Sequence, residues 1–487
     1  MKLSNLIENM PYIIKIYGNS DVNIENLILD SRIKTENGLF FCISGAVFDA
    51  HNFAKQAISN GNIALVVERY LEDIPVPQIV VETSRGAMAR ISSAFYNHPE
   101  KSLKLIGITG TKGKTTTSFM IKSVFESAGY NVGVIGTTGN VIGKKHIDSK
   151  LTTPDPIDLY STLKLMLDEG VEVVVMEVSA HAIDMLRLDG LRFEVGCFTN
   201  LSQDHLDYFG DMETYFQAKK RFFTSGYIKN AVLNSDEDSS VIIENDINIP
   251  HITYGIGANA DIYARNIEIL ESGASFNIHL GNVHNFDIKM KMTGNFNVYN
   301  ALAAAAVSLV MNIDYDHIKM GLEGVTSVPG RIELLNTHTN FSIILDYSHS
   351  PDSLKNILET VREFAKNRVI VVFGCGGDRD HGKRPIMGRT AGELADYSII
   401  TSDNPRMENP FRIIEAIEEG IKKVDARYEI VENRREAIKN AIKMAKEGDF
   451  IILAGKGHET YQERMGVKHP FDEKVVVKEL LIELGFN

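Results

Sequence analysis

"LIGITGTKGKTTTSFMIKSVFESAGY", residues 105–130, carries the clearest structural signal in the sequence. A run of apolar residues leads into a glycine-rich turn at residues 110–113, and an amphipathic segment follows that ends near Gly129. A strand pattern that changes to a helical pattern across a short turn is typical of an α/β fold. We therefore expect a buried strand, a tight turn and a helix here.

The turn has the composition of a phosphate-binding loop. Glycines let backbone N–H groups approach phosphate oxygens, and the helix N-terminus attracts negative charge. The Lys114 ammonium is expected at the β- and γ-phosphates of ATP, and the Thr115 hydroxyl at a Mg²⁺ ion. The loop has the short GxxGKT form, since Ile108 stands where the eight-residue pattern has its first glycine. The alternative is a glycine-rich turn without a nucleotide. The predicted loop residues are Gly110, Thr111, Lys112, Gly113, Lys114, Thr115 and Thr116.

The rest of the chain repeats the alternation of strands and helices. At 487 residues it is too long for one hydrophobic core, and its length indicates about three domains. Short β-branched runs alternate with helical stretches up to "HPEKSL" (98–103), a polar segment with the composition of a linker. A second alternation ends near "PGRIE" (329–333), and a third follows. We predict an α/β protein with domains at 1–101, 102–329 and 330–487.

Composition excludes several classes of protein. The apolar fraction of 44% is typical of globular proteins, and the net charge of −13 disfavours nucleic acid or an anionic membrane as a partner. No apolar run reaches the ~18 residues that a membrane span needs. The three cysteines show neither zinc spacing nor a disulfide framework, and the N-terminus has no signal-peptide pattern. We expect a cytoplasmic protein.

Two further segments carry candidate metal ligands. "VEVVVMEVSAHAID" (171–184) is a buried-type strand that runs out into Glu177, a carboxylate placed to hold Mg²⁺ beside the phosphate loop. A polar residue that ends a strand is the alternative. In the following segment His205 lies in an acidic loop, and Lys219 and Lys220 lie on a helix. On spacing alone, such a His or Lys belongs to a solvated surface.

The motifs together resemble one family. The chain contains, in this order, GTKGKTT, MEVSAH, TNLSQDHLDYFGD, YFQAKKRFF, GNFNVYNALAA, PGRIE, DYSHSPDSL, GCGGDRDHGKRP, SDNPR and GKGHETYQ. This set is similar to the ATP-dependent Mur ligases of peptidoglycan synthesis, within them to the branch that adds meso-diaminopimelate. The resemblance extends from about residue 30 to residue 472. It implies a uridine-nucleotide domain, a central P-loop ATPase domain and a C-terminal Rossmann-like domain.

The resemblance also implies a reaction and its catalytic residues. The γ-carboxyl of UDP-MurNAc-L-Ala-D-Glu is activated by ATP as an acyl phosphate, and an amine then displaces phosphate. Matching "YFQAKKRFF" to the family pattern selects Lys219, not Lys220, as a carbamylated lysine (N6-carboxylysine), with Phe222 in place of the usual Leu. Mg²⁺ would be held by Thr115, Glu177, His205 and Lys219. The implied catalytic residues are Lys114, Glu177, His205 and Lys219.

Binding residues follow by the same matching. The residues expected to bind UDP-MurNAc-L-Ala-D-Glu are Ser31, Ser44, Thr152, Thr153, Ser179 and Arg187. Met185 replaces an amide found in close relatives, which puts one sugar or peptide contact in doubt. Further ATP contacts are expected from Asn297, Asn300, Arg331, Asp346 and His349; the alternative for the Asn pair is helix capping.

The segment "SDNPR" (402–406) follows an apolar strand and carries Arg406 on a loop stiffened by Pro405. Meso-diaminopimelate differs from lysine by a second carboxylate, which a bidentate guanidinium recognises well. Arg406 is expected at that carboxylate and Glu459 at the distal ammonium. The full predicted set is Arg379, Asp403, Asn404, Pro405, Arg406, Gly455 and Glu459. The alternative is an exposed loop arginine.

Four other functions are alternatives for this sequence. A lysine-adding ligase of the same family could carry the same loop. Folylpolyglutamate synthetase shares the central ATPase but is disfavoured by "LDSR" (29–32) and "DNPR" (403–406). A nucleotide-dependent switch protein is disfavoured by the intact catalytic set, and a nucleic-acid-stimulated ATPase by the net charge. We expect a monomer with three small-molecule substrates, UDP-MurNAc-L-Ala-D-Glu, meso-diaminopimelate and ATP.

Overall fold

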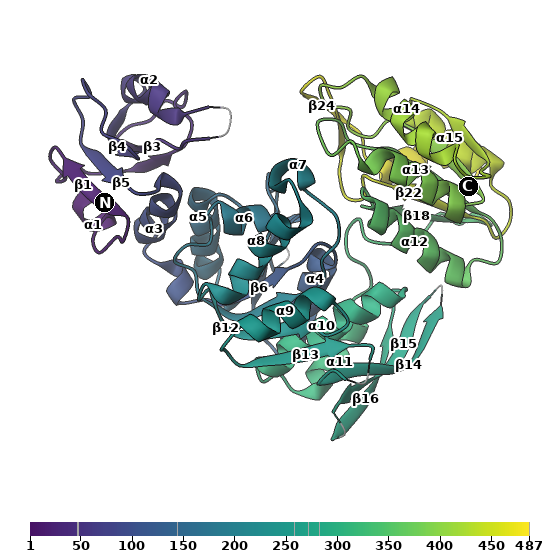
Figure 1. Cartoon of the computed structure of the whole chain (residues 1–487). Helices are drawn as coiled ribbons and strands as arrows, with labels where there is room; N and C mark the ends of the chain where they lie inside the picture. Colours follow the sequence, from purple (N-terminus) through teal and green to yellow (C-terminus); the bar gives the residue numbers. More distant parts are fainter. Residues whose placement is uncertain (46–47, 144, 258, 271, 282, 487) are drawn as a thin grey trace. The chain divides into compact units, whose positions relative to one another are not determined.

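The computed structural model describes residues 1–45, 48–143, 145–257, 259–270, 272–281 and 283–486 (Figure 1). The chain forms two compact units. The first consists of Met1–Thr109, Tyr130–Gly196 and Ala218–Ala231, and the second of Gly110–Gly129, Cys197–Gln217 and Val232–Asn487. Both units are α/β, as the sequence predicts, although the second unit also contains four consecutive strands, β13–β16 (residues 251–290), with no helix between them among the described residues.

The N-terminal part of the first unit is a five-stranded sheet covered on both faces. The strand order is β1-β5-β4-β3-β2, and only β1 is antiparallel to its neighbour. Helices α1 and α3 pack on one face of the sheet, and η1 and α2 pack on the other. The elements are α1 (Leu3–Leu6), β1 (Ile13–Tyr17), β2 (Asn26–Ile28), β3 (Gly38–Phe41), η1 (Ala50–Phe53), α2 (Ala54–Ser59), β4 (Asn62–Val67), β5 (Gln78–Val81) and α3 (Ser84–Phe95).

The segment read as a linker is folded. Pro99–Lys101 forms a 3-10 helix, η2, and Pro99 is buried. Ser93 Oγ donates to Glu100 at 2.8 Å, which ties the segment back to α3. The linker prediction was therefore wrong locally, because a proline at the first helical position favours a helical turn.

The remainder of the first unit is built on β6, β10 and β7. Strand β10 lies between β6 and β7 and is parallel to both, so the ends of β6 and β10 share one edge. Strands β8 and β9 continue from β7 as antiparallel hairpins. The elements are β6 (Lys104–Thr109), β7 (Val132–Gly136), β8 (Gly139–Ile142), β9 (Lys145–Ile147), α5 (Pro156–Asp168), β10 (Val173–Glu177) and α6 (Ala180–Asp184). Three elements run on into the second unit: β11 (Phe193–Phe198), α8 (Met212–Thr224) and β12 (Ile228–Asn234).

The second unit contains the phosphate-loop helix and an antiparallel meander. Strands β14, β15 and β16 pair antiparallel, and β13 pairs parallel to β14. The elements are α4 (Lys114–Ser127), α7 (Leu206–Phe209), α9 (Asp238–Asp246), β13 (His251–Gly255), β14 (Ile262–Leu270), β15 (Gly273–Leu280), β16 (His284–Met290), α10 (Asn295–Val310) and α11 (Tyr315–Gly324). The alanine-rich face of α10 is fully buried.

The C-terminal part of the second unit is a six-stranded sheet with helices on both faces (Figure 1). Its order is β17-β18-β22-β19-β20-β21, and the strands from β18 to β21 are parallel. Helices α12, α13 and α14 cover one face, and α15 and α16 cover the other. The carboxyl ends of β18, β19, β20 and β22 therefore share one edge, where ligands bind in such sheets.

The elements of this part are β17 (Glu333–Leu335), β18 (Ser342–Asp346), α12 (Pro351–Phe364), β19 (Val369–Phe373), α13 (Lys383–Leu394), β20 (Tyr397–Ile400), α14 (Pro410–Ile421), β21 (Tyr428–Ile430), α15 (Arg434–Met444), β22 (Phe450–Ala454), β23 (Tyr461–Arg464), β24 (Val467–Pro470) and α16 (Glu473–Glu483). Among the described residues, no helix is both long enough and apolar enough to cross a membrane.

Candidate active site

The predicted phosphate loop contains two glycines in a backbone conformation that other residues rarely adopt. Gly110 has φ +145° and Gly113 has φ +85°, and a Cβ added at either would collide with the side chain of Thr199 or Asn300. Both glycines are thus required sterically as well as conformationally. Lys114 begins α4, and its Nζ donates to the carbonyls of Gly110 (2.9 Å) and Thr111 (3.0 Å). The loop is compact, with its lysine folded over it.

Two residues that the sequence reading missed hold this loop in place. Thr199 Oγ1 donates to the Lys112 carbonyl at 2.7 Å, and Asn200 Oδ1 accepts from the Lys112 backbone N–H at 2.8 Å. The Thr111 N–H donates to the Asn200 carbonyl at 2.9 Å. The signal was present in "TNLSQDH", where Thr199 and Asn200 directly follow a buried strand.

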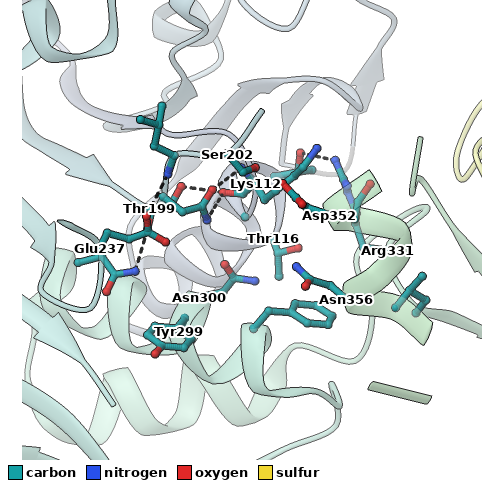
Figure 2. A pocket seen from close by; sticks show the side chains of 18 of the residues that line it. Lys112, Thr116, Thr199, Ser202, Glu237, Tyr299, Asn300, Arg331, Asp352 and Asn356 are labelled. Atoms are coloured by element: carbon teal, nitrogen blue, oxygen red, sulfur yellow. Dashed lines mark hydrogen bonds between the residues drawn. The ribbon is translucent and has the colours of Figure 1, made fainter. Parts of the chain in front are cut away.

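A cavity of about 390 Å³ opens beside the loop (Figure 2). Seven of the predicted ATP-binding residues line it: Lys112, Gly113, Thr115, Thr116, Asn300, Arg331 and Asp346. Arg331 NH2 donates to Thr115 Oγ1 at 3.4 Å, which brings the segment before β17 to the start of α4. Asn297 lines another cavity. It accepts a hydrogen bond from Asn300 at 3.0 Å and so contacts the first cavity through Asn300.

The cavity is also lined by residues that the sequence did not single out. They are Asn234, Asp236, Glu237, Tyr254, Phe296, Tyr299, Asp352 and Asn356. Tyr299 donates to Asp236 at 2.8 Å, and burial together with this bond raises the pKa of Tyr299. Burial also raises the pKa of Glu237. Aromatic rings and amide groups next to a phosphate loop are suited to a nucleoside.

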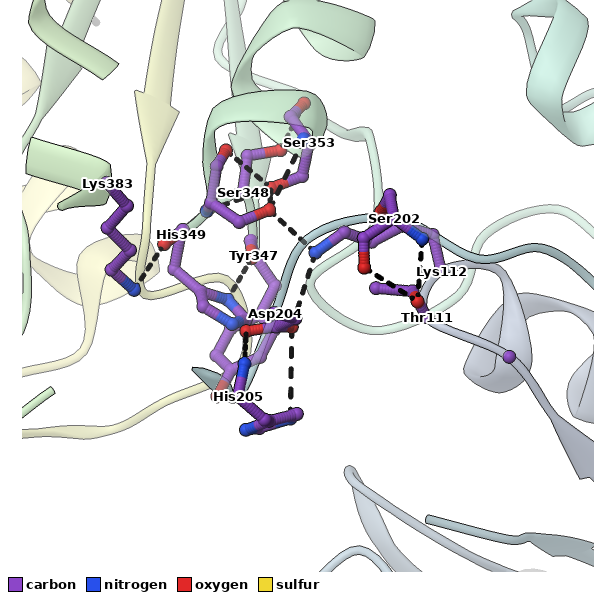
Figure 3. Close-up of polar contacts among 12 residues, drawn as sticks. Thr111, Lys112, Ser202, Asp204, His205, Tyr347, Ser348, His349, Ser353 and Lys383 are labelled. Atoms are coloured by element: carbon purple, nitrogen blue, oxygen red, sulfur yellow. Dashed lines mark hydrogen bonds and ion pairs between the residues drawn. The ribbon is translucent and has the colours of Figure 1, made fainter. Parts of the chain in front are cut away.

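A charged cluster connects the loop to the start of α12 (Figure 3). Lys112 Nζ donates to Ser350 Oγ at 2.6 Å and lies 3.6 Å from Asp204 Oδ2. Burial alone would raise the pKa of Asp204, but the nearby positive charges of Lys112 and His205 lower it overall. His349, a predicted ATP contact, donates from Nδ1 to the Tyr347 carbonyl at 2.8 Å, and Lys383 Nζ donates to the His349 carbonyl at 2.9 Å. Burial lowers the pKa of His349 to about 3, reinforced by the two lysines.

The predicted metal ligands are divided between the units. Glu177 and Lys219 lie in the first unit, and Thr115 and His205 lie in the second. Glu177 is buried and accepts from Thr137 through both oxygens, at 2.9 Å from N and 3.0 Å from Oγ1. Among the described residues, no cluster of three or more His, Cys, Asp or Glu side chains could hold a metal ion. A hydroxyl and a carboxylate are nevertheless oxygen donors of the kind that Mg²⁺ takes.

Three of the predicted dipeptide residues are brought together in the first unit. Thr153 Oγ1 donates to Ser179 Oγ at 3.2 Å, and Arg187 NH1 donates to the Thr153 carbonyl at 2.8 Å. Arg187 Nε also pairs with Asp155 at 2.9 Å. Met185 Sδ lies 3.4 Å from Arg187 NH2, so the residue that departs from the family pattern sits directly at this cluster.

The remaining residues predicted to bind UDP-MurNAc-L-Ala-D-Glu also make polar contacts with their neighbours. Thr152 Oγ1 lies 3.1 Å from Thr137 Oγ1, next to Glu177. Ser31 Oγ donates to Gln56 at 2.9 Å, and Ser44 Oγ donates to Glu68 at 2.9 Å. Part of the loop after Ser44, at positions 46–47, lies outside the described residues.

The predicted amino-acid residues gather at the carboxyl edge of the C-terminal sheet. Asn404, after β20, donates from Nδ2 to Glu459 Oε2 at 2.8 Å, and Glu459 follows β22. A Cβ added at Gly376, after β19, would lie 3.0 Å from Arg406 NH1 and 3.9 Å from Arg379 Cγ. Gly455 has φ +120°, and an added Cβ would overlap Asp403 Oδ2. Pro405 lies in the same loop, between Asn404 and Arg406.

This edge contains carboxylates, an amide and guanidinium groups in one place. Such a set can bind a ligand that carries both an ammonium and a carboxylate. With the phosphate loop and its cavity, this edge gives the α/β fold the features expected of an ATP-dependent ligase.

Comparisons with known proteins identify the family. Residues 108–308 match the Mur ligase middle domain, and residues 330–457 match the Mur ligase, glutamate ligase domain. UDP-N-acetylmuramoyl-L-alanyl-D-glutamate--2,6-diaminopimelate ligase 1 of Clostridium acetobutylicum is 45% identical over 99% of this chain and 100% of its own length. The corresponding ligase of Geobacillus thermodenitrificans is also 45% identical, over 98% of this chain and 99% of its own. The chain belongs to the Mur ligase family.

Solved structures agree with this placement. A 2,6-diaminopimelate ligase structure is 31% identical and has a TM-score of 0.70, with 100% of both chains covered. The Mycobacterium tuberculosis folylpolyglutamate synthase, solved with ADP and AMPPCP, is 18% identical with a TM-score of 0.63 over 76% of this chain and 92% of its own. That likeness shows a shared fold alone.

Proposed function

We propose that this enzyme joins meso-diaminopimelate to the D-Glu γ-carboxyl of UDP-MurNAc-L-Ala-D-Glu, with ATP as the energy source, in peptidoglycan precursor synthesis. The observation that carries the proposal is the edge of the C-terminal sheet, where Arg406, Arg379 and the Asn404 backbone lie around Gly376 and where Asn404 pairs with Glu459. Two guanidinium groups and a carboxylate match the two carboxylates and the distal ammonium of the zwitterion. The names of the most similar relatives support the same substrates.

The ATP half of the reaction is assigned to the phosphate loop and its cavity. Lys114 and the loop N–H groups would bind the β- and γ-phosphates and stabilise negative charge during transfer to the substrate carboxylate. Asn300, Arg331 and Asp346 line the cavity where the nucleoside would bind. The amine of the amino acid then attacks the acyl phosphate carbon, an amide forms, and phosphate leaves with both electrons of the broken bond. Positioning supplies most of the acceleration, so no covalent enzyme intermediate is needed.

The donor nucleotide is assigned to the first unit. Ser31 and Ser44 would contact uridine diphosphate, and the cluster of Thr152, Thr153, Ser179 and Arg187 would bind the muramoyl-dipeptide. We place the domain boundaries of this assignment at 1–101, 102–329 and 330–487. We further propose that the enzyme acts as a monomer in the cytoplasm.

Magnesium and a modified lysine complete the proposal. Thr115, Glu177, His205 and a carbamylated Lys219 would hold Mg²⁺, which when bound neutralises phosphate charge. Lys219 is almost fully buried on α8, where an added carboxylate would be shielded from exchange with water. A crystal grown with nucleotide and bicarbonate tests the modification. Density for an unmodified ammonium at Lys219 would contradict it.

The function is tested by measuring phosphate release with ATP, UDP-MurNAc-L-Ala-D-Glu and a panel of amino acids. We expect release to require both the nucleotide-linked dipeptide and meso-diaminopimelate. A clear preference for lysine would favour the lysine-adding alternative, and release without either substrate would favour a nucleotide-dependent switch.

A further inference from the structure

Lys456 is a fully buried lysine at the proposed amino-acid site, and the proposed mechanism does not use it. It follows β22, between Gly455 and Gly457. Its Nζ donates to Glu459 Oε2 at 3.0 Å and to Asn404 Oδ1 at 3.2 Å. Burial of an unpaired ammonium costs free energy, so the folded protein needs both of these hydrogen bonds to Lys456.

Lys456 therefore contacts Glu459, which is expected at the distal ammonium of the substrate, and Asn404, another residue of the predicted amino-acid set. Asn404 is fixed from both ends, because its Oδ1 also accepts from the Glu463 N–H at 2.9 Å while its Nδ2 donates to Glu459. In the described part of the chain both contacts of Glu459 are made by Oε2, and Oε1 is the oxygen that remains for a ligand. The carboxylate is thus held in one orientation before any substrate binds.

The same lysine changes the charge that a ligand meets. The Lys456 ammonium compensates Glu459. Burial would raise the pKa of Asp403, and Lys456 is the largest of the positive charges that lower it instead. Arg434, which also lowers the pKa of Asp403, is already paired with Glu473 at 2.8 Å. A second ammonium from a ligand would therefore approach a carboxylate whose charge is already balanced, with a like charge close by.

We propose that Lys456 is a positioning residue that sets the preference for a zwitterionic over a purely cationic amino-acid side chain. The inference rests on the proposed function. Lysine would bring one uncompensated positive charge next to the Lys456 ammonium. The distal end of meso-diaminopimelate has no net charge, and its carboxylate gains a partner in Arg406. Lys456 thus discriminates by repelling the wrong ligand, while Arg406 attracts the right one.

The test is the ratio of kcat/KM for meso-diaminopimelate to kcat/KM for lysine, measured on the full-length enzyme. In Lys456→Met we expect this ratio to fall by about tenfold or more, with an absolute rise in kcat/KM for lysine that appears mainly as a lower KM. Lys456→Arg keeps the charge and should keep the preference. Lys456→Gln removes the charge but keeps a donor for Asn404, so it gives the same reading if Lys456→Met does not fold.

The matched control is Lys468→Met. Lys468 is exposed on β24. Its Nζ lies 3.8 Å from the centroid of the Tyr461 ring, and Lys456 Nζ lies 5.7 Å from the same ring. We expect Lys468→Met to leave the ratio unchanged. A uniform loss for both amino acids in Lys456→Gln, with an unchanged ratio, would overturn the inference and leave Lys456 a structural residue. If the unaltered enzyme does not use meso-diaminopimelate at all, the proposed function fails instead, and the two failures are distinguishable.

Discussion

Arg406 holds a backbone conformation that a non-glycine residue rarely adopts. Its φ is +52°, in the left-handed region, which costs about 1 kcal/mol or more. Two backbone hydrogen bonds maintain it, from Arg406 N to the Glu463 carbonyl at 3.1 Å and from Met465 N to the Arg406 carbonyl at 2.7 Å. The guanidinium is thereby directed to the Gly377 carbonyl, 2.6 Å from NH1. Strain of this kind, fixed from outside the loop, is common at ligand sites.

Replacing Arg406 with lysine tests its role in recognition. Arg406→Lys keeps the charge but loses the bidentate fork, so kcat/KM for meso-diaminopimelate should fall about 10²- to 10³-fold while that for lysine changes far less. Steady-state phosphate release measures both. Arg412→Lys, at an exposed position on α14, is the control. A loss of less than about threefold would contradict the assignment.

A second prediction concerns Gly455. In Gly455→Ala the new methyl group would overlap Asp403 Oδ2 at a position with φ +120°, so we expect a sharp loss of ligase activity. Gly466→Ala is the matched control, since Gly466 also has a positive φ but its nearest neighbour to an added Cβ is Met407 Sδ at 4.0 Å. Gly466→Ala should cost about 1 kcal/mol of stability and leave activity intact. Equal effects of the two substitutions would argue against a closely packed site at Gly455.

The pH dependence of stability should report on His349. Burial, then Lys383 and Lys112, lower its folded-state pKa to about 3, whereas a histidine in an unfolded chain titrates near ~6.5. Between these values the unfolded chain binds more protons, so the free energy of unfolding falls as the pH falls. Urea unfolding from pH 7 to pH 4 should show a shallower slope for His349→Asn than for the unaltered protein. Parallel slopes would contradict this.

At the scale of elements, the sequence predicted the regular alternation of strands and helices but not the departures from it. The strand, turn and helix around the phosphate loop appear as predicted, because local apolar pattern and glycine chemistry determine them. The antiparallel meander β14–β16 and the folded segment at Pro99–Lys101 were not predicted. Strand pairing depends on partners far along the chain, which one sequence does not reveal.

One inter-element contact in the first unit has a measurable consequence. Asp189, in the loop that carries Arg187, accepts two hydrogen bonds from Arg90 on α3 (2.7 and 3.0 Å) and one from Tyr12 (2.9 Å). Tyr160 on α5 donates to the Asp189 carbonyl at 3.3 Å. These bonds clamp the Arg187 loop between two helices.

We expect Arg90→Ala to lower the free energy of unfolding by about 1–2 kcal/mol, because two charge-assisted hydrogen bonds to a largely buried carboxylate are lost from a partly exposed arginine. KM for the nucleotide-linked substrate should rise, since Arg187 loses its support. Lys229→Ala removes a comparable but exposed pair with Glu194 and serves as the control. Urea unfolding and substrate titration measure the two effects, and identical behaviour of both variants would refute the clamp.

At the scale of the molecule, the candidate site was predictable where motif and topology coincide. Three separate strand ends bring Arg379, Asn404 and Glu459 to one edge, and the order of motifs along the sequence anticipated this. Lys456 was missed although it lies inside a quoted motif, because burial and pairing are properties of the folded chain. The net charge of −13 says equally little about this site, where the buried cations Lys456 and Arg434 are each paired with a carboxylate.

Mass spectrometry of the product formed from UDP-MurNAc-L-Ala-D-Glu and ATP, with equal concentrations of meso-diaminopimelate and lysine, tests the central claim most directly. We predict that the nucleotide product carries one diaminopimelate residue in amide linkage, with one phosphate released for each product formed. A product that carries lysine, or ATP hydrolysis without any amide product, would contradict the account.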